Sequence, residues 1–253
     1  MKKMKTNWIF LVIAVLFLAG CGNKTKKTVN NDRVVDGTRI IHFSGYDWRV
    51  GNSKDNRQGP GPNYFSDSKE NVWLDDGGNL HLKITHRDGR WNCAKISLLE
   101  SHGYGTYIFH VASRVDGFDK NVVGGLFTYA NDTSEIDIEF SKWAKDTTED
   151  SQFVIQPGWN PGNHYRYFLD QTGEQSTHWF NWQPDSVVFA SYQGNVGDNP
   201  PANQLMAQWT YTGVDNPKPG KEAAKINLWL YRGNPPTDGK EVEMVLSGFE
   251  FRK

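Results

Sequence analysis

Short segments in which apolar and polar residues alternate are the feature that most restricts the fold of this chain. Alternation with a period of two is typical of a strand with one buried face, because successive side chains point to opposite faces. The pattern occurs over residues 80–85, 107–115, 187–192 and 241–251, and clusters of Pro, Gly and Asn at 58–63, 157–163, 194–202 and 215–220 indicate loops. No long segment has a helical period. Many short strands with regular turns predict an all-β fold, an antiparallel β-sandwich.

Residues 135–140, Glu-Ile-Asp-Ile-Glu-Phe, combine this alternation with crowded acidic residues. In a strand Glu135, Asp137 and Glu139 share one face, and the apolar residues of the hexamer share the other. Like charges side by side on a sheet repel, at a cost of about 0.2–1 kcal/mol for each contact. An ordinary half-buried strand with a solvated acidic face is one interpretation, and a functional need for crowded carboxylates is the other.

Crowded carboxylates suit the breaking of a glycosidic bond. Their pKa values move apart, so that one group stays protonated near neutral pH while another is ionised. An acid and a nucleophile are the pair that a retaining glycosidase uses. The Cα atoms of Glu135 and Glu139 are roughly 13 Å apart at about 3.3 Å per residue. Side chains that lean inward over Asp137 bring the two carboxyl groups within roughly 5–6 Å, near the separation that this mechanism needs.

The hexamer resembles the active-site signature of glycoside hydrolase family 16, which includes lichenases, laminarinases, agarases, carrageenases and transglycosylases. Four further segments resemble motifs of that family and occur in the family order: Tyr104-Gly105-Thr106-Tyr107, Leu126-Phe127-Thr128-Tyr129, His178 to Asp185, and Ile226-Asn227-Leu228-Trp229. The acidic signature is fairly specific, whereas each of the other motifs is weak alone. Together they extend the resemblance over roughly residues 40–253.

The resemblance implies a jelly-roll sandwich of the concanavalin A-like type with a concave substrate cleft. It implies that Glu135 is the nucleophile, that Glu139 is first the acid and then the base, and that Asp137 tunes both pKa values. The residues that it nominates for the cleft are Phe127, Tyr129, Gln152, Asn227 and Trp229, and position alone adds Trp143 and Trp159. Packing is the alternative role for each of them. Trp182 is expected in the core.

Several positions depart from the lichenase pattern. Lichenases have a Glu after the Y-G-x-Y motif and a basic residue two further on, where this chain has Ile108 and His110. It also has Val154 in place of an Asn and Thr133 in place of a Trp. The carboxylates are kept while lichenase sugar contacts are absent, which disfavours mixed-linkage glucan more than it disfavours hydrolysis. The pattern fits an enzyme for another β-linked glycan, or a transglycosylase.

The N-terminus, residues 1–20, resembles a bacterial lipoprotein signal peptide. Three lysines within the first five residues precede an uncharged run over 8–20, which at 13 residues is short for a membrane-spanning helix of about 20. The segment 18–21, Leu-Ala-Gly-Cys, resembles a lipobox, which implies cleavage before Cys21 and lipidation of that residue. A plain signal peptide or a short anchor is the alternative.

Three parts are expected along the chain. Residues 1–20 are the signal peptide, the polar residues 21–37 are the lipidated cysteine with a flexible tether, and residues 38–253 are one glycoside hydrolase domain. The domain is therefore expected outside the cytoplasm, held to a bacterial membrane by its lipid. Which membrane carries the anchor cannot be read from the sequence.

Composition limits the partners. The formal net charge of −1 gives no reason to expect nucleic acid or an acidic polymer. Ten tryptophans, all but one after the signal peptide, are many, and flat aromatic faces pack on sugar rings. The seven histidines include no close pair at metal-ligand spacing, so no cofactor and no metal site are expected. The family often carries a structural calcium, for which no ligands can be assigned. Cys93 is expected as a buried structural thiol.

The sequence thus predicts a lipid-anchored, monomeric, retaining endo-β-glycanase that cleaves a polysaccharide of the β-1,3/β-1,4-glucan type by double displacement. A carbohydrate-binding sandwich without turnover is one alternative, although a pure binder has no reason to keep a self-repelling acidic cluster. A cell-surface transglycosylase is the other, because the same covalent intermediate can be captured by a sugar instead of water.

Overall fold

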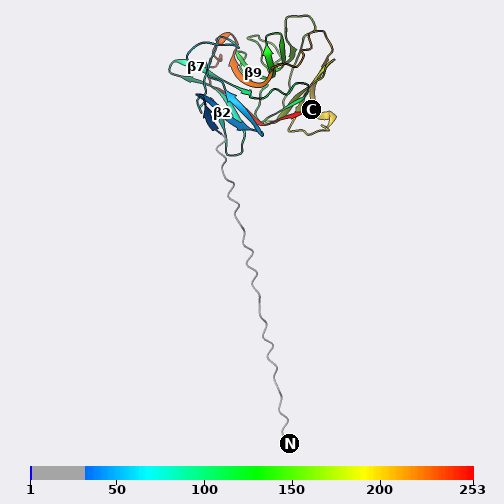
Figure 1. Cartoon of the computed structure of the whole chain (residues 1–253), viewed down its shortest axis with the longest axis horizontal. Coiled ribbons are helices and arrows are strands. Elements are labelled where there is room, and N and C mark those ends of the chain that lie inside the picture. Colours follow the sequence, from blue (N-terminus) through cyan, green and yellow to red (C-terminus); the bar gives the residue numbers. More distant parts are fainter. Residues whose placement is uncertain (2–31) are drawn as a thin grey trace. The chain divides into compact units, whose positions relative to one another are not determined.

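A computed structural model describes Met1 and residues 32–253 of the chain (Figure 1). The predictions for the signal peptide, for Cys21 and for the first part of the tether lie outside these residues. Within the described part, no helix is long and apolar enough to cross a membrane.

Nearly all regular structure is β-strand, as the alternation predicts. The first sheet is antiparallel and follows the order β1 (Asp32–Val35), β2 (Thr38–Phe43), β3 (Tyr46–Val50), β7 (Arg90–Leu98), β16 (Ala223–Leu230), β9 (Val122–Asn131), β10 (Ser134–Phe140), β11 (Ser151–Ile155) and β12 (His164–Tyr167). The acidic hexamer therefore lies inside this sheet and not at its edge.

The second sheet is also antiparallel. Its order is β5 (Val72–Leu74), β6 (Leu80–Arg87), β17 (Val242–Arg252), β8 (Gly105–Val111), β13 (Ser176–Trp182), β14 (Val187–Gln193) and β15 (Leu205–Tyr211). The hairpin between β6 and β7 joins the two sheets, and the short strand β4 (Tyr64–Phe65) pairs in parallel with β7. The helical segments of the described residues are two 3-10 turns, η1 (Ala202–Gln204) and η2 (Tyr231–Gly233).

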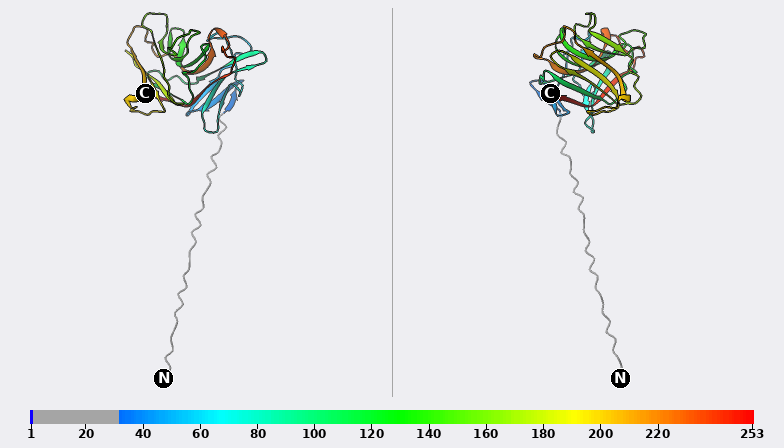
Figure 2. Two further views of the ribbon diagram at one scale, coloured as in Figure 1. Left: turned by 180° about the vertical axis from the view of Figure 1, so that it is seen from behind. Right: turned by 90° about the vertical axis from the view of Figure 1, so that its right-hand side faces the viewer.

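The two sheets pack face to face around an aromatic and aliphatic core, which forms the predicted jelly-roll sandwich (Figure 2). Phe140 of β10 and Phe153 of β11 meet Phe180 and Phe189 of the second sheet in this core. Trp182, at 1% exposure, and the buried Cys93 lie in the core as expected. Because one face of each strand is committed to the core, the alternate residues of the first sheet face outward onto its other surface.

The folded region begins earlier than residue 38, so the prediction of a tether over 21–37 is wrong at its C-terminal end. Asp32–Val35 form β1 and pair with β2. The Arg39 guanidinium donates hydrogen bonds to both carboxylate oxygens of Asp32 at 2.9 Å. A strand ladder and a bidentate ion pair hold these polar residues, whose composition alone suggested a linker.

Candidate active site

Strand β10 presents its acidic residues on the outer face of the first sheet. Ile136, Ile138 and Phe140 are fully buried in the core, so Glu135, Asp137 and Glu139 face the other way. Asp137 is nevertheless only 2% exposed, because side chains of neighbouring strands surround it. The sequence prediction that the three carboxylates share a face away from the core is confirmed.

The strands on either side of β10 set the surroundings of each carboxylate. On β9, Tyr129 lies opposite Glu135, Phe127 opposite Asp137, and Gly125 opposite Glu139. On β11, the residue opposite Glu139 is Gln152, and the residue opposite Asp137 is Val154. Cross-strand partners share one face of a sheet, so these side chains surround the acidic row.

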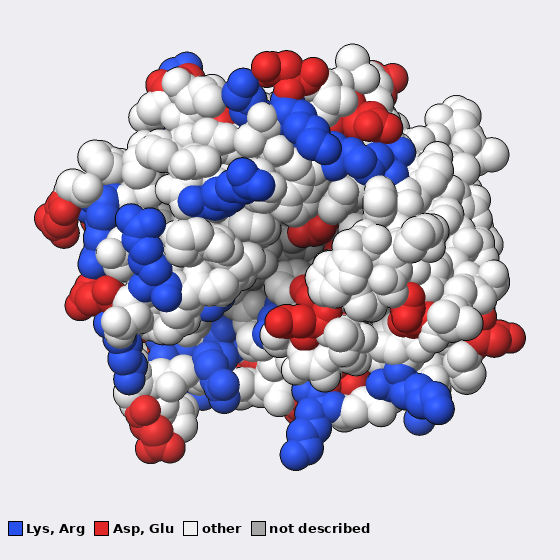
Figure 3. Space-filling model, turned by 90° about the horizontal axis from the view of Figure 1, so that it is seen from above, with Lys and Arg blue, Asp and Glu red and all other residues white. Residues whose placement is uncertain are grey.

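Strands β16 and β7 continue the same face. Asn227 and Lys225 of β16 lie opposite Gly125 and Phe127, and β7 places Lys95 beside Asn227 and Ser97 beside Lys225. The outer face of the sheet is therefore lined by polar and aromatic side chains over several strands. It borders a cavity of about 640 Å³, and Figure 3 shows a hollow in the molecular surface with acidic side chains inside it and basic side chains around it.

Most of the residues that the sequence analysis nominates as catalytic or substrate-binding line the cavity. Seven of the nominees line it: Phe127, Tyr129, Glu135, Asp137, Glu139, Asn227 and Trp229. They come from β9, β10 and β16, which are neighbours in the sheet although β16 is distant in sequence. A concave pocket with aromatic walls and convergent polar groups is the usual form of a binding or active site.

A side-chain hydrogen bond joins the carboxyl groups of Glu135 and Asp137. Burial raises the pKa of Asp137 well above its usual range, and the two neighbouring carboxylates raise it further. Burial also raises the pKa of Glu135 to about 7, and the hydrogen bond from Asp137 acts in the opposite direction. Gln156 donates to Oδ2 of Asp137 at 3.1 Å. Asp137 is thus the protonated donor and Glu135 the acceptor, which favours an ionised Glu135.

Glu139 has a separate environment on the other side of Asp137. Burial raises the pKa of Glu139 to about 7, so a substantial fraction of the group holds its proton at neutral pH. The Gln152 side-chain amide donates to Glu139 at 2.8 Å, and Arg166 of β12 donates to the Gln152 oxygen at 3.1 Å. Arg166 also donates to the carbonyl of Glu149 at 3.1 Å. This chain of contacts orients Glu139, and the Arg166 charge restrains the rise of its pKa.

Asn227 has an unsatisfied acceptor at the cavity. The residue is 4% exposed, and its Oδ1 atom has no hydrogen-bond partner among the described residues. A Cβ atom on Gly125 would lie 2.4 Å from that oxygen, so only glycine leaves room for it. An unpaired buried acceptor costs free energy, and a hydroxyl group of a bound sugar would supply the missing donor.

Three nominated residues do not line the cavity. Gln152 acts on it indirectly through Glu139. Trp143 packs edge-on against Trp229 and Tyr231, with ring centroids 6.0 and 5.4 Å away, and so supports a cavity residue from behind. Trp159 is 77% exposed in a loop. Binding roles for these residues stay predictions.

Ile108 and His110, which the sequence analysis matched to two positions of the lichenase pattern, do not line the cavity. Both residues belong to β8 of the second sheet, where His110 contacts Glu250 and Thr177. The topology puts β7, and with it Lys95 and Ser97, at the cavity instead. The residue types at positions 108 and 110 therefore carry no information about the substrate.

Sequence reasoning missed the basic residues of the site. Lys225 lies in the cavity, and its ammonium sits 3.9 Å from the ring centroid of Tyr129. Alternation could have found it, since Lys225 shares a strand face with the nominated Asn227 and Trp229. Arg166 and Lys95 gave no such signal, because their positions depend on which strands become neighbours.

Other reaction types find no support in the described residues. Burial raises the pKa of the Cys93 thiol to about 12, so a thiolate nucleophile does not form there. Among residues 32–253, no group of three or more His, Cys, Asp or Glu side chains is arranged to hold a metal ion. Among the residues that line the cavity, Glu135, Asp137 and Glu139 are the carboxyl groups whose pKa values are raised.

Known proteins share the fold. No family model matches the sequence, and no curated protein matches it. Among solved structures, a β-glucanase from Bacillus licheniformis is 22% identical with a TM-score of 0.58, covering 87% of this chain and 94% of that chain. A β-1,3-1,4-glucanase (lichenase) from a mouse hindgut metagenome is 22% identical with a TM-score of 0.56, covering 81% and 92%.

A third neighbour carries a different description. The structure of a pseudo β-1,3-glucanase of Mycobacterium tuberculosis is 20% identical with a TM-score of 0.56, covering 79% of this chain and 88% of that chain. At these identities the likeness concerns the fold, which occurs both in active glucanases and in a protein described as a pseudo-enzyme. The chain thus has the jelly-roll fold of β-glucanases and lichenase-like glycoside hydrolases.

Proposed function

We propose that this protein is a retaining endo-β-glycanase that hydrolyses internal β-glycosidic bonds of a polysaccharide. The observation that carries the proposal is the set of three carboxyl groups on one face of β10, buried in a cavity and held at raised pKa values. The β-glucanase fold supports the same reaction class.

In the first step Glu135 acts as the nucleophile. Its carboxylate oxygen attacks the anomeric carbon, while the bond from that carbon to the leaving sugar's oxygen breaks. Glu139 gives its proton to that oxygen, so the leaving group departs as a neutral alcohol. The hydrogen bond from Asp137 favours the ionised form of Glu135 before attack, and the Gln152 amide holds the Glu139 carboxyl toward the bond.

In the second step a water molecule displaces Glu135 from the anomeric carbon. The ionised Glu139 takes a proton from a water molecule, whose oxygen attacks the anomeric carbon and releases the Glu135 carboxylate. Each step inverts the anomeric carbon, so the configuration is retained. Phe127, Tyr129 and Trp229 would pack on sugar rings, and Asn227 would accept a hydrogen bond from a hydroxyl.

The N-terminal sequence supports a position for this monomeric domain outside the cytoplasm, held by a lipid on Cys21. Mass spectrometry of the N-terminal peptide from the membrane fraction tests this position. We expect a diacylated Cys21, and release of a Cys21→Ala variant from the membrane. An unmodified Cys21 would contradict lipid anchoring.

The activity is tested by counting new reducing ends. The soluble domain, residues 32–253, and its Glu135→Gln variant are incubated with β-1,3-, β-1,4- and mixed-linkage glucans, agar and carrageenan. We expect release by the wild type on at least one polymer and none by the variant. Oligosaccharides longer than the starting material would indicate glycosyl transfer. Release that survives in the variant would contradict the proposed mechanism, and binding without any release would favour the carbohydrate-binding alternative.

A further inference from the structure

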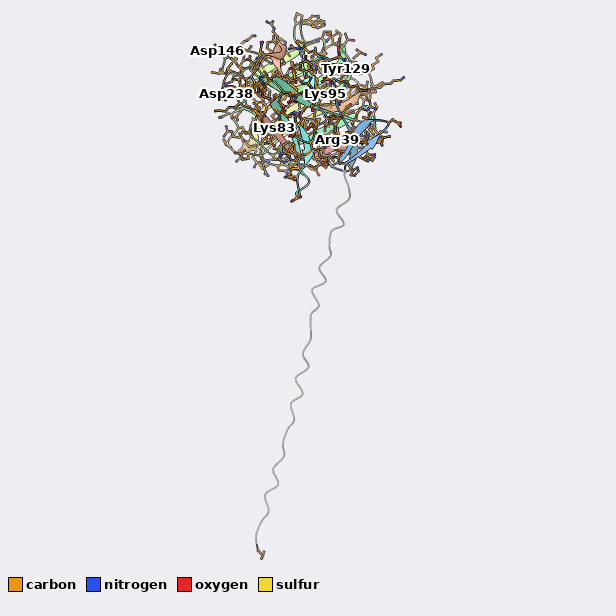
Figure 4. All side chains as sticks on the ribbon, turned by 90° about the vertical axis from the view of Figure 1, so that its left-hand side faces the viewer. Arg39, Lys83, Lys95, Tyr129, Asp146 and Asp238 are labelled. Atoms are coloured by element: carbon orange, nitrogen blue, oxygen red, sulfur yellow. The ribbon has the colours of Figure 1, made fainter. Side chains whose placement is uncertain are left out.

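Three basic side chains line the proposed substrate cavity on the side of the sheet away from β11 and β12. They are Arg49 of β3, Lys95 of β7 and Lys225 of β16. Figure 4 labels Lys95 and Tyr129, which come from β7 and β9 and line the same cavity. The three strands are consecutive in the sheet, so the basic residues form one continuous wall.

None of the three has an acidic partner within ion-pair distance among the described residues. Other basic residues are paired: Lys83 contacts Glu241 at 2.7 Å, and Arg39 contacts Asp32 at 2.9 Å. Lys95 instead lies 3.4 Å from the side-chain oxygen of Gln58, and Lys225 rests on the Tyr129 ring. The cavity wall thus keeps cationic groups that the protein does not neutralise.

Keeping these charges has a cost. Lys95 and Lys225 are half-buried, and burial lowers the pKa of both, with the mutual repulsion of the two ammonium groups lowering the pKa of Lys95 further. A neutral sugar offers hydroxyl oxygens, which accept hydrogen bonds from a cation but carry no charge that would offset it. An anionic group offers charge-assisted hydrogen bonds, and the planar Arg49 guanidinium suits a carboxylate or a sulfate in particular.

The three cations lie on consecutive strands, along a line that crosses the sheet from β10. Neighbouring strands lie about 4.8 Å apart, so β16, β7 and β3 are roughly 10, 14 and 19 Å from β10. A polysaccharide that crosses the strands from the carboxylates of β10 would meet Lys225, Lys95 and Arg49 in turn. The cations are therefore placed to contact successive sugars, at a distance from the bond that breaks.

We propose that the cleft accepts a β-linked glycan that carries anionic substituents, sulfate esters or carboxylates, and that Arg49 and Lys95 select it. The inference rests on the proposed glycanase function and specifies its substrate class. The formal net charge of −1 points away from acidic polymers, but a whole-chain sum does not describe a wall on which the positive charges are gathered.

Lys225 also affects the pKa of the proposed nucleophile Glu135, so it is not a suitable position for a test of substrate binding. Its charge lies close enough to Glu135 to lower the pKa of that group, so its removal would change catalysis as well as binding. Arg49 and Lys95 are farther from the carboxylates and are the informative positions. Lys218, an exposed lysine that does not line the cavity, is a matched control.

The test is calorimetric titration of the Glu135→Gln protein, which binds without turnover. The probes are carrageenan oligosaccharides, the same oligosaccharides after chemical desulfation, oligomannuronate, and laminarin oligosaccharides. We expect an anionic probe to bind about tenfold or more tightly than its neutral counterpart at low salt, with the difference shrinking at high salt. The added Arg49→Gln/Lys95→Gln substitutions should abolish this difference, and Lys218→Gln should preserve it. Thermal unfolding of each variant checks that it is folded.

The two arms of the probe set identify the substituent, because carrageenan carries sulfate and oligomannuronate carries carboxylate. Equal or tighter binding of laminarin, a preference that survives in the double variant, or no binding of any anionic probe would overturn the inference. Reducing-end release from a neutral glucan would then leave the proposed glycanase function standing. Salt-sensitive binding of an anionic probe with no release by the wild type would instead overturn the glycanase function.

Discussion

The charged residues on the outer face of the second sheet and the carboxylates of β10 in the first sheet differ in whether they are paired. On the second sheet, His81 and Lys83 of β6 lie next to Glu243 and Glu241, with nitrogen-to-oxygen distances of 2.7 Å in both pairs. On the first sheet, the row of carboxylates on β10 has no basic side chain within ion-pair distance among the described residues. Both faces have the same strand alternation, so alternation alone does not separate an ordinary surface from a site.

The difference lies in whether each charge is compensated. Exposed ion pairs contribute about 0–1 kcal/mol to the free energy of unfolding. Substitutions in the ion pairs of the second sheet should therefore change stability little. Crowded, buried carboxylates are held at raised pKa values and oppose folding at neutral pH. A destabilising cluster of carboxylates in a cavity indicates a functional site. Unpaired charged groups therefore locate the site better than the mere presence of charged residues does.

The sharpest test of this contrast replaces one glutamate from each face. Glu135→Gln should lower kcat by more than about 10⁴-fold, because it removes the nucleophile, and Glu139→Gln by about 10²–10⁴-fold, because it removes the acid. The matched surface variant Glu243→Gln should stay within about twofold. Initial rates on the active polymer measure all three. A similar loss in Glu243→Gln and Glu135→Gln would erase the distinction between the faces.

Asp137 tests whether the proton shared within the cluster matters. Asp137→Ala removes the donor to Glu135 and should lower kcat by about 10²-fold, whereas Asp137→Asn keeps a donor and should lose only about tenfold. In Asp137→Ala the acidic limb of the pH–rate profile should move to higher pH, since that hydrogen bond lowers the pKa of Glu135. Equal rates and unshifted profiles in the two variants would show that the donor is irrelevant.

Arg166 tests the positioning of the acid. Arg166→Gln removes the contact that orients Gln152 and the charge that lowers the pKa of Glu139, so kcat should fall by about 3–10-fold. The alkaline limb of the profile should shift to higher pH, because Glu139 would then hold its proton longer. Arg114→Gln, which breaks an exposed pair with Asp116, is the control. A fall in kcat with no shift of the limb would assign Arg166 a purely structural role.

The smallest expected effect is a gain in stability. The pKa of Glu135 and Glu139 rises from 4.5 to about 7 on folding, and that of Asp137 also rises. Between these values the folded state binds more protons than the unfolded state, so the free energy of unfolding falls as pH rises through this window. Asp137→Asn relieves the cluster and should raise stability at pH 8 by roughly 1–3 kcal/mol, and by less at pH 4.

Thermal unfolding at both pH values measures this gain, which corresponds to a Tm increase of about 2–10 °C. Glu243→Gln should show no such increase, because its side chain is exposed to solvent and is not part of a buried row of like charges. A loss of stability at pH 8, or an equal gain at pH 4, would contradict the view that the cluster is strained by its own charge.

Local pattern predicted the parts of the site that lie on one strand or its immediate neighbours. The alternation of the hexamer placed Glu135, Asp137 and Glu139 on one face, which the structure confirms. The resemblance to family 16 nominated Phe127 and Tyr129, which line the same cavity. The prediction for the hexamer needed only the period of two, which fixes the side chains that face together.

Pairing between distant segments could not be read in the same way. Arg49 and Lys95 reach the cavity because β3 and β7 lie beside β16, although these strands are far apart in the chain. The match of Ile108 and His110 to lichenase positions met the same limit, since the sheet to which β8 belongs is decided by tertiary packing.

The most direct test of the central claim is to trap the covalent intermediate on Glu135. The Glu139→Gln variant is treated with a glycosyl fluoride of the active oligosaccharide, which reacts without an acid and whose product cannot be hydrolysed quickly without a base. Intact-protein mass spectrometry should show a gain of one glycosyl group, and peptide mapping should place it on Glu135. Consumption of the fluoride without an adduct, or an adduct on another residue, would contradict the claim that Glu135 is the nucleophile.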